Sequence, residues 1–199
     1  MEQEPLTKRR PALGCLFEVV ETLVLTIVIF VGIQVFVAQP YKVEQVSMES
    51  SLLPGQYVLV DKLTPRWAPY SRGDIVVFDP PEAWSTAGRV PFIKRVVGVP
   101  GDRIELRDGD VFVDDVKLEE PYVYDDNGVA QQTKPSPGGP TEWLVSDGAL
   151  FVMGDHREES ADSRSFGSIA VGHVIGRAWL RYWPFDTIGI LPEPSYAGL

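Results

Sequence analysis

Three groups of residues in this 199-residue chain could do chemistry, and the first is a serine next to a turn. Ser47 lies in the segment Val46-Ser47-Met48, a few residues before Pro54-Gly55. A serine in such a place ordinarily caps a turn with its hydroxyl. A serine hydroxyl can also attack a carbonyl carbon, provided that a neighbouring base removes its proton. The residues around Ser47 do not decide whether it is a turn residue or a nucleophile.

The second group is a lysine inside an apolar strand. Lys94 stands between Ile93 and Arg95 in a run that starts at Phe92. A lysine in a strand usually marks an edge that faces solvent. If its face is buried instead, lost hydration disfavours the ammonium form and lowers the pKa of the amine from about 10.4; a nearby Arg95 charge would act in the same direction. A neutral amine near pH 7 can serve as a general base.

The third group is a dense polar stretch, residues 154–167, that directly follows an apolar run. It contains Asp155, Ser160, Asp162 and Arg164. Such a stretch is typical of a solvated loop. Alternatively, its acidic and basic side chains pair into a rigid network that holds a hydroxyl and a base in register.

Composition excludes several other kinds of site. Lys plus Arg total 18 against 28 Asp plus Glu, a net charge of −10, and general nucleic-acid binding needs cations to neutralise phosphates. The single Cys15 excludes an intrachain disulfide and a cysteine zinc cluster. Because the chain has only two histidines, His156 and His173, we also expect no metal site.

An apolar run near the amino terminus predicts a single membrane-spanning helix. Residues 22–38 carry no charge, and with the apolar residues before them they give a predicted span of 18–38. That length is close to the ~20 residues needed to cross the hydrocarbon layer. The alternatives are a buried core helix and the apolar core of a cleavable signal peptide, and the run is longer than the roughly 7–15 residues of such a core.

The charges on either side of the run predict its orientation. Three basic residues at positions 8–10 precede it, and only Lys42 follows within reach. The positive-inside rule then places the tail, residues 1–17, in the cytoplasm. Residues 39–199 would form an extracytoplasmic domain that is tethered to the cell membrane by one span.

The part of the chain after the apolar run predicts a mainly β domain. Its β-rich runs, separated by Gly or Pro signals, are 57–60, 74–78, 92–97, 111–113 and 150–153. Asp108-Gly109 between two short apolar runs predicts a hairpin. No stretch after residue 40 has a convincing helical period. Two segments rich in Pro and Gly, 80–91 and 125–140, are expected to be loops, and the second is interpreted as a loop insertion.

Five different segments follow the apolar run, one after another along the chain. They are Ser47-Met48, Gly73-Asp74-Ile75-Val76-Val77-Phe78, Lys94-Arg95-Val96-Val97-Gly98-Val99-Pro100-Gly101-Asp102, the 154–167 stretch with its Ser-x-Asp-Ser-Arg core, and Gly176-Arg177-Ala178-Trp179-Leu180-Arg181-Tyr182-Trp183-Pro184. As an ordered set they resemble the bacterial type I signal peptidases, over residues 18–190. The resemblance implies an N-terminal transmembrane helix followed by a catalytic domain of coiled antiparallel β-sheets, with an extended apolar surface that rests on the bilayer.

The resemblance also implies a function. A membrane-bound serine endopeptidase of this family removes N-terminal signal peptides from exported preproteins and cleaves after small residues in an A-x-A-like site. Ser47 would be the nucleophile and Lys94 the general base, a Ser–Lys dyad in place of a Ser–His–Asp triad. No cofactor is implied. The expected partners are exported preproteins and the lipid bilayer, with no nucleic acid, and we expect a monomer.

Further roles follow from the same resemblance. Ser160 would hydrogen-bond the Lys94 amine and aim it. The supporting ionic network would comprise Asp155, Asp162, Arg164 and Arg95. The backbone N–H of Ser47 and the side chain of Gln45 would hold the oxyanion. Shallow substrate pockets would be lined by residues that flank the dyad in sequence, namely Val43, Met48, Leu52, Phe92 and Ile93.

Three positions depart from the family's pattern. Ser50-Ser51 stands where Pro-Thr is usual, which predicts a less rigid turn after the nucleophile. Gln45 stands where Ser or Gly is usual, and loss of one oxyanion donor typically costs roughly 10²–10³ in rate. His156 replaces an Asn. Two other readings stay open: a Ser–His–Asp hydrolase with His156 or His173 as base, and a weak or inactive membrane-tethered β-domain that binds exported chains.

Overall fold

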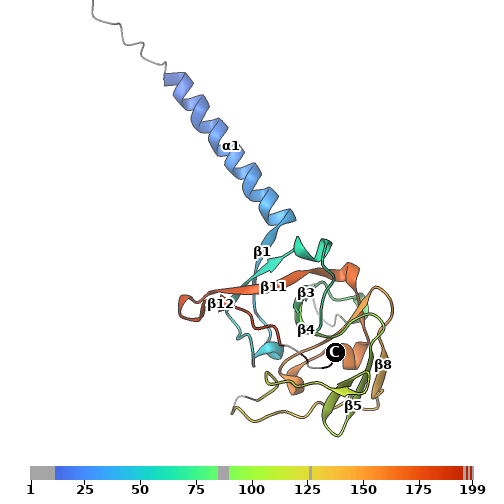
Figure 1. Ribbon diagram of the computed structural model, residues 1–199. Helices are drawn as coiled ribbons and strands as arrows, with labels where there is room; N and C mark the ends of the chain where they lie inside the picture. Colours follow the sequence, from blue (N-terminus) through green and yellow to red (C-terminus); the bar gives the residue numbers. More distant parts are fainter. Residues whose placement is uncertain (1–11, 85–89, 126, 195, 197, 199) are drawn as a thin grey trace, which may run out of the picture. The chain divides into compact units, whose positions relative to one another are not determined.

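The computed structural model describes residues 12–84, 90–125, 127–194, 196 and 198. The chain divides into two compact units, Met1–Val37 and Ala38–Leu199 (Figure 1). The basic residues at positions 8–10 and the centre of the predicted 80–91 loop, residues 85–89, lie outside the described residues.

The first unit holds one helix, α1 (Ala12–Phe36). It begins earlier than the predicted residue 18 and ends two residues before the predicted end at residue 38. Its part Gly14–Phe36 is long and apolar enough to cross a membrane. The hydroxyls of Thr22 and Thr26 donate to carbonyls four residues earlier, at 2.8 and 2.7 Å, so these polar groups are satisfied within the helix as a lipid environment requires.

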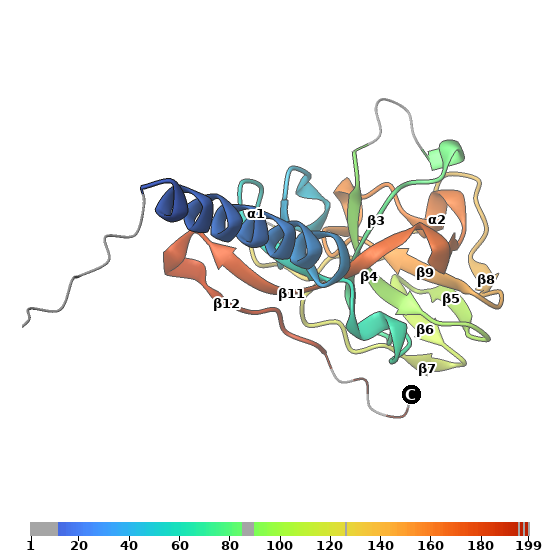
Figure 2. The same cartoon turned by 90° about the horizontal axis from the view of Figure 1, so that it is seen from above.

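The second unit is built from two antiparallel sheets (Figures 1 and 2). The larger sheet has the order β1-β2-β11-β3-β4-β9-β10, and β12 pairs with β11. Its strands are β1 (Ala38–Lys42), β2 (Tyr57–Asp61), β3 (Ile75–Phe78), β4 (Phe92–Gly98), β9 (Ala149–Met153), β10 (Ile169–Ala170), β11 (Val174–Trp183) and β12 (Gly189–Ile190). The smaller sheet has the order β7-β6-β5-β8 and lies at the end of the unit away from β12. Its strands are β5 (Arg103–Arg107), β6 (Asp110–Val113), β7 (Val116–Lys117) and β8 (Glu142–Leu144).

The helical segments of the second unit are short. They are the single-turn helix α2 (Ser163–Phe166) and the 3₁₀ turns Val46–Met48, Thr64–Arg66, Glu82–Trp84, Arg157–Glu159, Val171–His173 and Phe185–Thr187. The prediction of a mainly β domain is therefore confirmed. The β-rich runs of the sequence fall on β2, β3, β4, β6 and β9.

The predicted hairpin is also present, between β5 and β6. Asp108 and Gly109 both have positive φ, 55° and 88°, and Arg107 pairs with Asp110 across the turn. Two residues with positive φ are what the tight turn of a twisted hairpin requires, and an Asp-Gly pair adopts them at low cost.

The core fills both faces of the larger sheet around β3 and β4. All four residues of β3 are buried, whereas β2 alternates between buried and half-buried positions. One cluster packs Val58 and Val60 against Ile93, and another packs Phe78 against Val96. A strand that is buried on both faces fixes its side chains tightly, and β4 is such a strand.

Candidate active site

A 3₁₀ turn, Val46–Met48, presents Ser47. Its backbone is held by bonds from Glu49 N to Val46 O (2.9 Å) and from Leu52 N to Met48 O (2.6 Å). The backbone N–H of His156 donates to the Ser47 carbonyl at 3.1 Å, so the polar stretch 154–167 is tied directly to this turn. Ser47 is 4% exposed, which leaves its side chain at the floor of a depression.

Strand β4 brings Lys94 to the same point. Its amine nitrogen Nζ lies 2.5 Å from Ser47 Oγ, and Lys94 is only 1% exposed. The two residues are 47 positions apart in the chain, and the pairing of β4 with β3 holds the lysine in place. The structure thus unites the first two groups that the sequence singled out.

Burial changes the chemistry of the Lys94 amine. Loss of hydration is the main cause that lowers its pKa from 10.5 to about 8; the Arg164 charge lowers it further, while Asp162 and Asp155 oppose the change. The condition under which Arg95 was expected to lower this pKa, a close approach of the two charges, is not met. Alternation along β4 turns Arg95 to the other face, where it pairs with Asp155, and Arg164 is the cation that lowers the pKa of Lys94.

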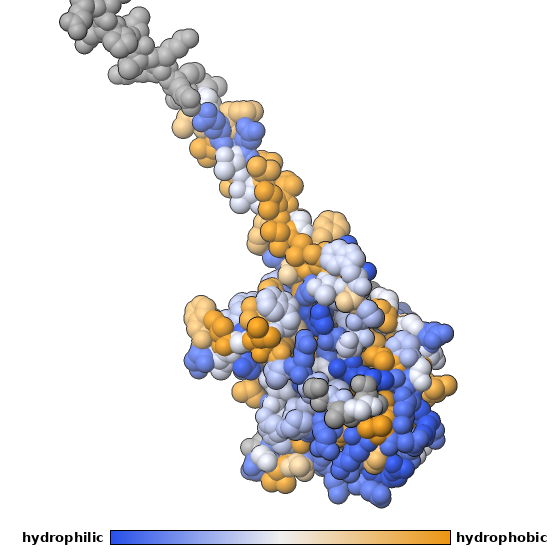
Figure 3. All heavy atoms as spheres, viewed as in Figure 1, coloured by the Kyte–Doolittle hydropathy of each residue, from blue (hydrophilic) through white to orange (hydrophobic). Residues whose placement is uncertain are grey.

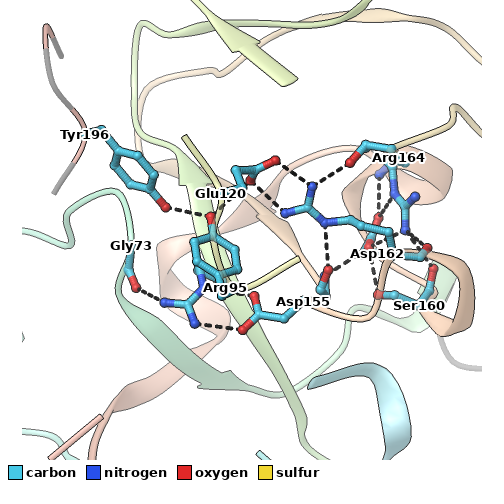
Figure 4. A network of polar contacts seen from close by, with 12 residues as sticks. Gly73, Arg95, Glu120, Asp155, Ser160, Asp162, Arg164 and Tyr196 are labelled. Atoms are coloured by element: carbon cyan, nitrogen blue, oxygen red, sulfur yellow. Dashed lines mark hydrogen bonds and ion pairs between the residues drawn. The ribbon is translucent and has the colours of Figure 1, made fainter. Parts of the chain in front are cut away.

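Asp162 is the centre of a buried network beside Ser47 and Lys94 (Figure 4). It accepts two parallel bonds from the Arg164 guanidinium, both at 2.9 Å, and one from the Gly154 N–H at 3.1 Å. Burial by itself raises the pKa of Asp162, but these bonds and the Arg164 charge hold that pKa below its usual value. The carboxylate therefore stays ionised, and with Arg164 it forms a rigid pair behind the amine.

Ser160 does not take the role expected for it. Its hydroxyl donates to Asp162 Oδ2 at 2.7 Å, and no hydrogen bond joins it to Lys94 among the described residues. A carboxylate is a stronger acceptor than a neutral amine, which explains this choice. Ser160 thus supports the site through Asp162 and does not aim the amine directly.

A second buried pair, Arg95 with Asp155, holds the turn after Ser47. The guanidinium donates to both oxygens of Asp155 at 2.8 and 2.7 Å and to Gly73 O at 2.8 Å, and both charged side chains are 0% exposed. The Ser51 hydroxyl donates to Asp155 at 2.5 Å and accepts from Arg95 at 3.1 Å. Ser51, one of the positions that depart from the family's pattern, is therefore hydrogen-bonded to this buried pair.

Sequence reasoning missed three contributors to the network. Arg157 is buried and pairs with Glu120 at 2.9 and 2.7 Å. Gly154 lies so close to the site that a Cβ there would be 2.5 Å from Ser47 O and 2.3 Å from Ser160 Oγ. The ring of Tyr122 covers Arg95 at 4.0 Å. A glycine between an apolar strand and an acidic residue was the available signal for Gly154; no local pattern marks the other two.

Two adjoining hollows lie beside the dyad and share Glu44 and Gln45. The first is lined by Glu44, Gln45, Val46, Ser47, Phe92, Lys94, Glu159 and Ala161. The second is lined by Tyr41, Lys42, Val43, Glu44, Gln45, Val58, Val77, Val90, Pro91 and Ile93. Together they make a groove between the segment before Ser47 and the start of β4.

Three of the five residues that were expected to line substrate pockets lie along this groove. Val43, Phe92 and Ile93 line it. Met48 and Leu52 do not, because both are 0% exposed and pack in the core. For these two residues the expectation is corrected: their apolar side chains fill the interior beneath the turn.

Strand β4 has an open edge along this groove. Its residues Phe92–Lys94 pair with β3, whereas pairing with β9 starts only at Arg95. Within the part of the chain that the structure describes, the other side of Phe92–Lys94 has no strand partner. An unpaired edge of this kind can accept an extended peptide.

Neither histidine is placed to act on Ser47. The His156 ring nitrogen Nδ1 lies 3.8 Å from Glu49 Oε2, and His173 lines a separate hollow with Asp79 and Glu82. No hydrogen bond joins either ring to Ser47 among the residues that the structure describes. The geometry thus gives no support to a Ser–His–Asp hydrolase.

Comparison with known proteins places the chain in one family. The family model described as signal peptidase, peptidase S26, matches residues 16–183. Signal peptidase I of Leptolyngbya laminosa is 34% identical over 197 residues, which cover 97% of this chain and 93% of the relative. Signal peptidase I of Bacillus licheniformis is 32% identical over 192 residues, which cover 94% and 98%. The crystal structure of a signal peptidase I from Enterococcus faecalis V583 superposes with a TM-score of 0.44 at 27% identity, over 55% of this chain and 97% of that one.

Proposed function

The chain belongs to the type I signal peptidases of peptidase family S26, and we propose that it cleaves with Ser47 as nucleophile and Lys94 as general base. It is a serine endopeptidase that removes signal peptides from exported preproteins. The observation that carries the proposed dyad is the 2.5 Å contact between Lys94 Nζ and Ser47 Oγ inside a buried site.

The chemistry follows from a neutral amine. With a pKa of about 8, roughly a tenth of the Lys94 side chains are neutral at pH 7. The amine takes the Ser47 proton as the oxygen attacks the scissile carbonyl, and the same proton then passes to the departing amine. Lys94 next activates a water molecule that releases the acyl group from Ser47.

The tetrahedral oxyanion needs donors beside Ser47, and we assign them to the Ser47 N–H and the Gln45 amide. The Ser47 N–H makes no hydrogen bond among the described residues. Gln45 lines the same hollow as Ser47 and Lys94, although it departs from the family's usual residue. Donors that are already aimed at the developing charge contribute most to such a reaction.

The groove supports an extended substrate. A peptide that lies along the open edge of Phe92–Lys94 alternates its side chains, so the first and third residues before the cut face the same wall. Val43 and Ile93 line an apolar hollow in that wall. Small residues fit there, which accounts for an A-x-A-like cleavage site.

Substrate variants test the specificity. We expect a precursor with Ala→Leu at the first or third position before the cut to be cleaved at least about tenfold more slowly, because the proposed pockets take Ala-sized side chains and exclude larger ones. The same change at the second position, which faces away, leaves cleavage within about twofold. Gel or mass-spectrometric detection of the product gives both rates. Equal slowing at all three positions contradicts the extended pose, and no cleavage of any precursor favours the tethered binding domain instead.

The membrane arrangement is also a proposal. We assign α1 as a single span with a cytoplasmic amino terminus, on the basis of its apolar length and the basic residues before it. Exposed apolar side chains gather around β12, including Trp183, Phe185 and Ile190, and they would rest on the bilayer (Figure 3). External protease should degrade the domain after residue 39 in intact spheroplasts; protection of that domain contradicts this orientation.

A further inference from the structure

One short segment, residues 120–124, contacts the site at every second residue, and it begins with a turn in which the Val123 N–H donates to Glu120 O at 3.0 Å. Glu120, Tyr122 and Tyr124 each bond or cover a different part of the network around Ser47. We propose that this segment, which we call the brace, positions the nucleophile, and that Tyr124 is a positioning residue which acts through Ser50. The proposal rests on the proposed function, because it concerns the geometry of the Ser47–Lys94 dyad.

Glu120 anchors the first end of the brace (Figure 4). Its two carboxylate oxygens accept from the Arg157 guanidinium at 2.9 and 2.7 Å. Arg157 in turn donates to Gly154 O at 2.9 Å and to Thr133 Oγ1 at 2.6 Å, and its side chain is fully buried. A bidentate pair that is satisfied on all sides is among the stiffest contacts a protein can make.

Tyr122 forms the middle of the brace. Its ring lies 4.0 Å from the Arg95 guanidinium carbon, and its hydroxyl bonds Tyr196 at 2.7 Å and Glu120 at 3.0 Å. Stacking of an arginine on an aromatic ring holds the guanidinium plane in one orientation. Because Arg95 also bonds the hydroxyl of Ser51, the ring indirectly steadies the turn that follows the nucleophile.

Tyr124 closes the brace onto that turn. Its hydroxyl donates to Ser50 O at 2.5 Å, and the Ser50 hydroxyl donates to Tyr124 O at 2.8 Å. Behind it, Asp125 Oδ1 accepts from the N–H groups of Asn127 and Val129 at 2.9 and 2.8 Å, which fixes the loop that carries the tyrosine. Two reciprocal bonds therefore join this loop to Ser50.

Backbone hydrogen bonds connect residues 49–51 directly with the turn that carries Ser47. Ser51 N donates to Met48 O at 2.8 Å, and Glu49 N donates to Val46 O at 2.9 Å, so residues 49–51 continue the turn that carries the nucleophile. Lys94 belongs to another element, strand β4, which is held by its pairing with β3. The brace thus sets the distance between the two reacting atoms. It also accounts for Ser50, because its two bonds with Tyr124 hold the turn at the position where a proline is usual.

Tyr124→Phe tests the brace, since it removes one hydroxyl and leaves the ring. We expect kcat to fall by about three- to tenfold, as for the loss of one hydrogen bond. KM should stay unchanged because Tyr124 does not line the groove. The midpoint of the pH profile should also stay unchanged because Lys94 is untouched. As a change near the surface, it should leave the thermal midpoint within about 2 °C of the wild type. Ser50→Ala, which removes the opposite bond, should give the same pattern.

Tyr182→Phe is the matched control, because the Tyr182 hydroxyl makes no hydrogen bond among the described residues; it should equal the wild type. Wild-type kcat in both Tyr124→Phe and Ser50→Ala overturns the brace and leaves the dyad standing. A fall in activity that only follows a loss of folded protein, or a rise in KM alone, also overturns it. Failure of the wild-type protein to cleave any precursor overturns the proposed function itself, so the two failures are distinguishable.

Discussion

Lys94→Met should abolish precursor cleavage while the protein stays folded. Methionine nearly matches the length of the lysine side chain but has no amine, so Ser47 loses the group that takes its proton. A general base contributes about 10²–10⁴ to a rate, and we expect a loss at the upper end because Lys94 serves both acylation and deacylation. Since burial disfavours the ammonium form, the change should not lower the thermal midpoint. Initial cleavage rates and a thermal melt of the detergent-solubilised protein measure both effects.

A second inactive variant and a control variant complete this experiment. Ser47→Ala should be equally inactive, and combining the two changes should cost nothing further, because the dyad acts as a unit. Lys117→Met is the control: Lys117 is an exposed lysine on β7 that pairs with Asp110, and its loss should leave activity unchanged. Substantial activity in folded Lys94→Met contradicts the dyad.

Gly154→Ala should be nearly as damaging, although it removes no functional group. The new Cβ would lie 2.5 Å from Ser47 O and 2.3 Å from Ser160 Oγ. The Ser47 carbonyl is backbone, so the nucleophile's turn must move away from β9 and the stretch behind it. A displacement of about 1 Å at a reacting atom can cost about 10²-fold, and we expect at least that loss in kcat.

Gly172→Ala is the matched control, because nothing lies within 4 Å of a Cβ built there. It should keep wild-type kcat. Rates and circular dichroism spectra of both variants separate a moved nucleophile from a misfolded chain. A Gly154→Ala enzyme with normal kcat means that the close approach to Ser47 is not needed for catalysis.

Local patterns in the sequence predicted much of the fold. The β-rich runs and the Asp108-Gly109 turn depend on neighbours in the chain, and both occur as expected. Strand β11 was recognised only as a family-like segment. Its place between β2 and β3 is set by partners more than 90 positions away, and Gly176 permits that approach because a Cβ there would lie 2.3 Å from Asp61 O.

The sequence predicted which residues belong to the candidate site better than it predicted the contacts that they make. Alternation places Lys94 and Arg95 on opposite faces of β4 but cannot say that both faces are buried. The choice of Ser160 to donate to Asp162 depends on a three-dimensional competition between acceptors. Met48 and Leu52 flank Ser47 in sequence, yet they pack in the core. The brace left no signal, because the hydrogen bonds of Glu120 to Arg157 and of Tyr124 to Ser50 join residues 37 and 74 positions apart.

The charge state of the Lys94 amine tests the central claim most directly. Lysine side-chain NMR in detergent micelles, assigned by comparison with Lys94→Met, follows its titration. We expect a midpoint near 8, well below the ordinary pKa of a lysine amine, about 10.4. Because the neutral form is the base, kcat/KM should rise with pH through the same midpoint and then level off. If Lys94 titrates at the ordinary pKa of a lysine amine and activity does not follow its titration, a buried amine is not the base of this enzyme.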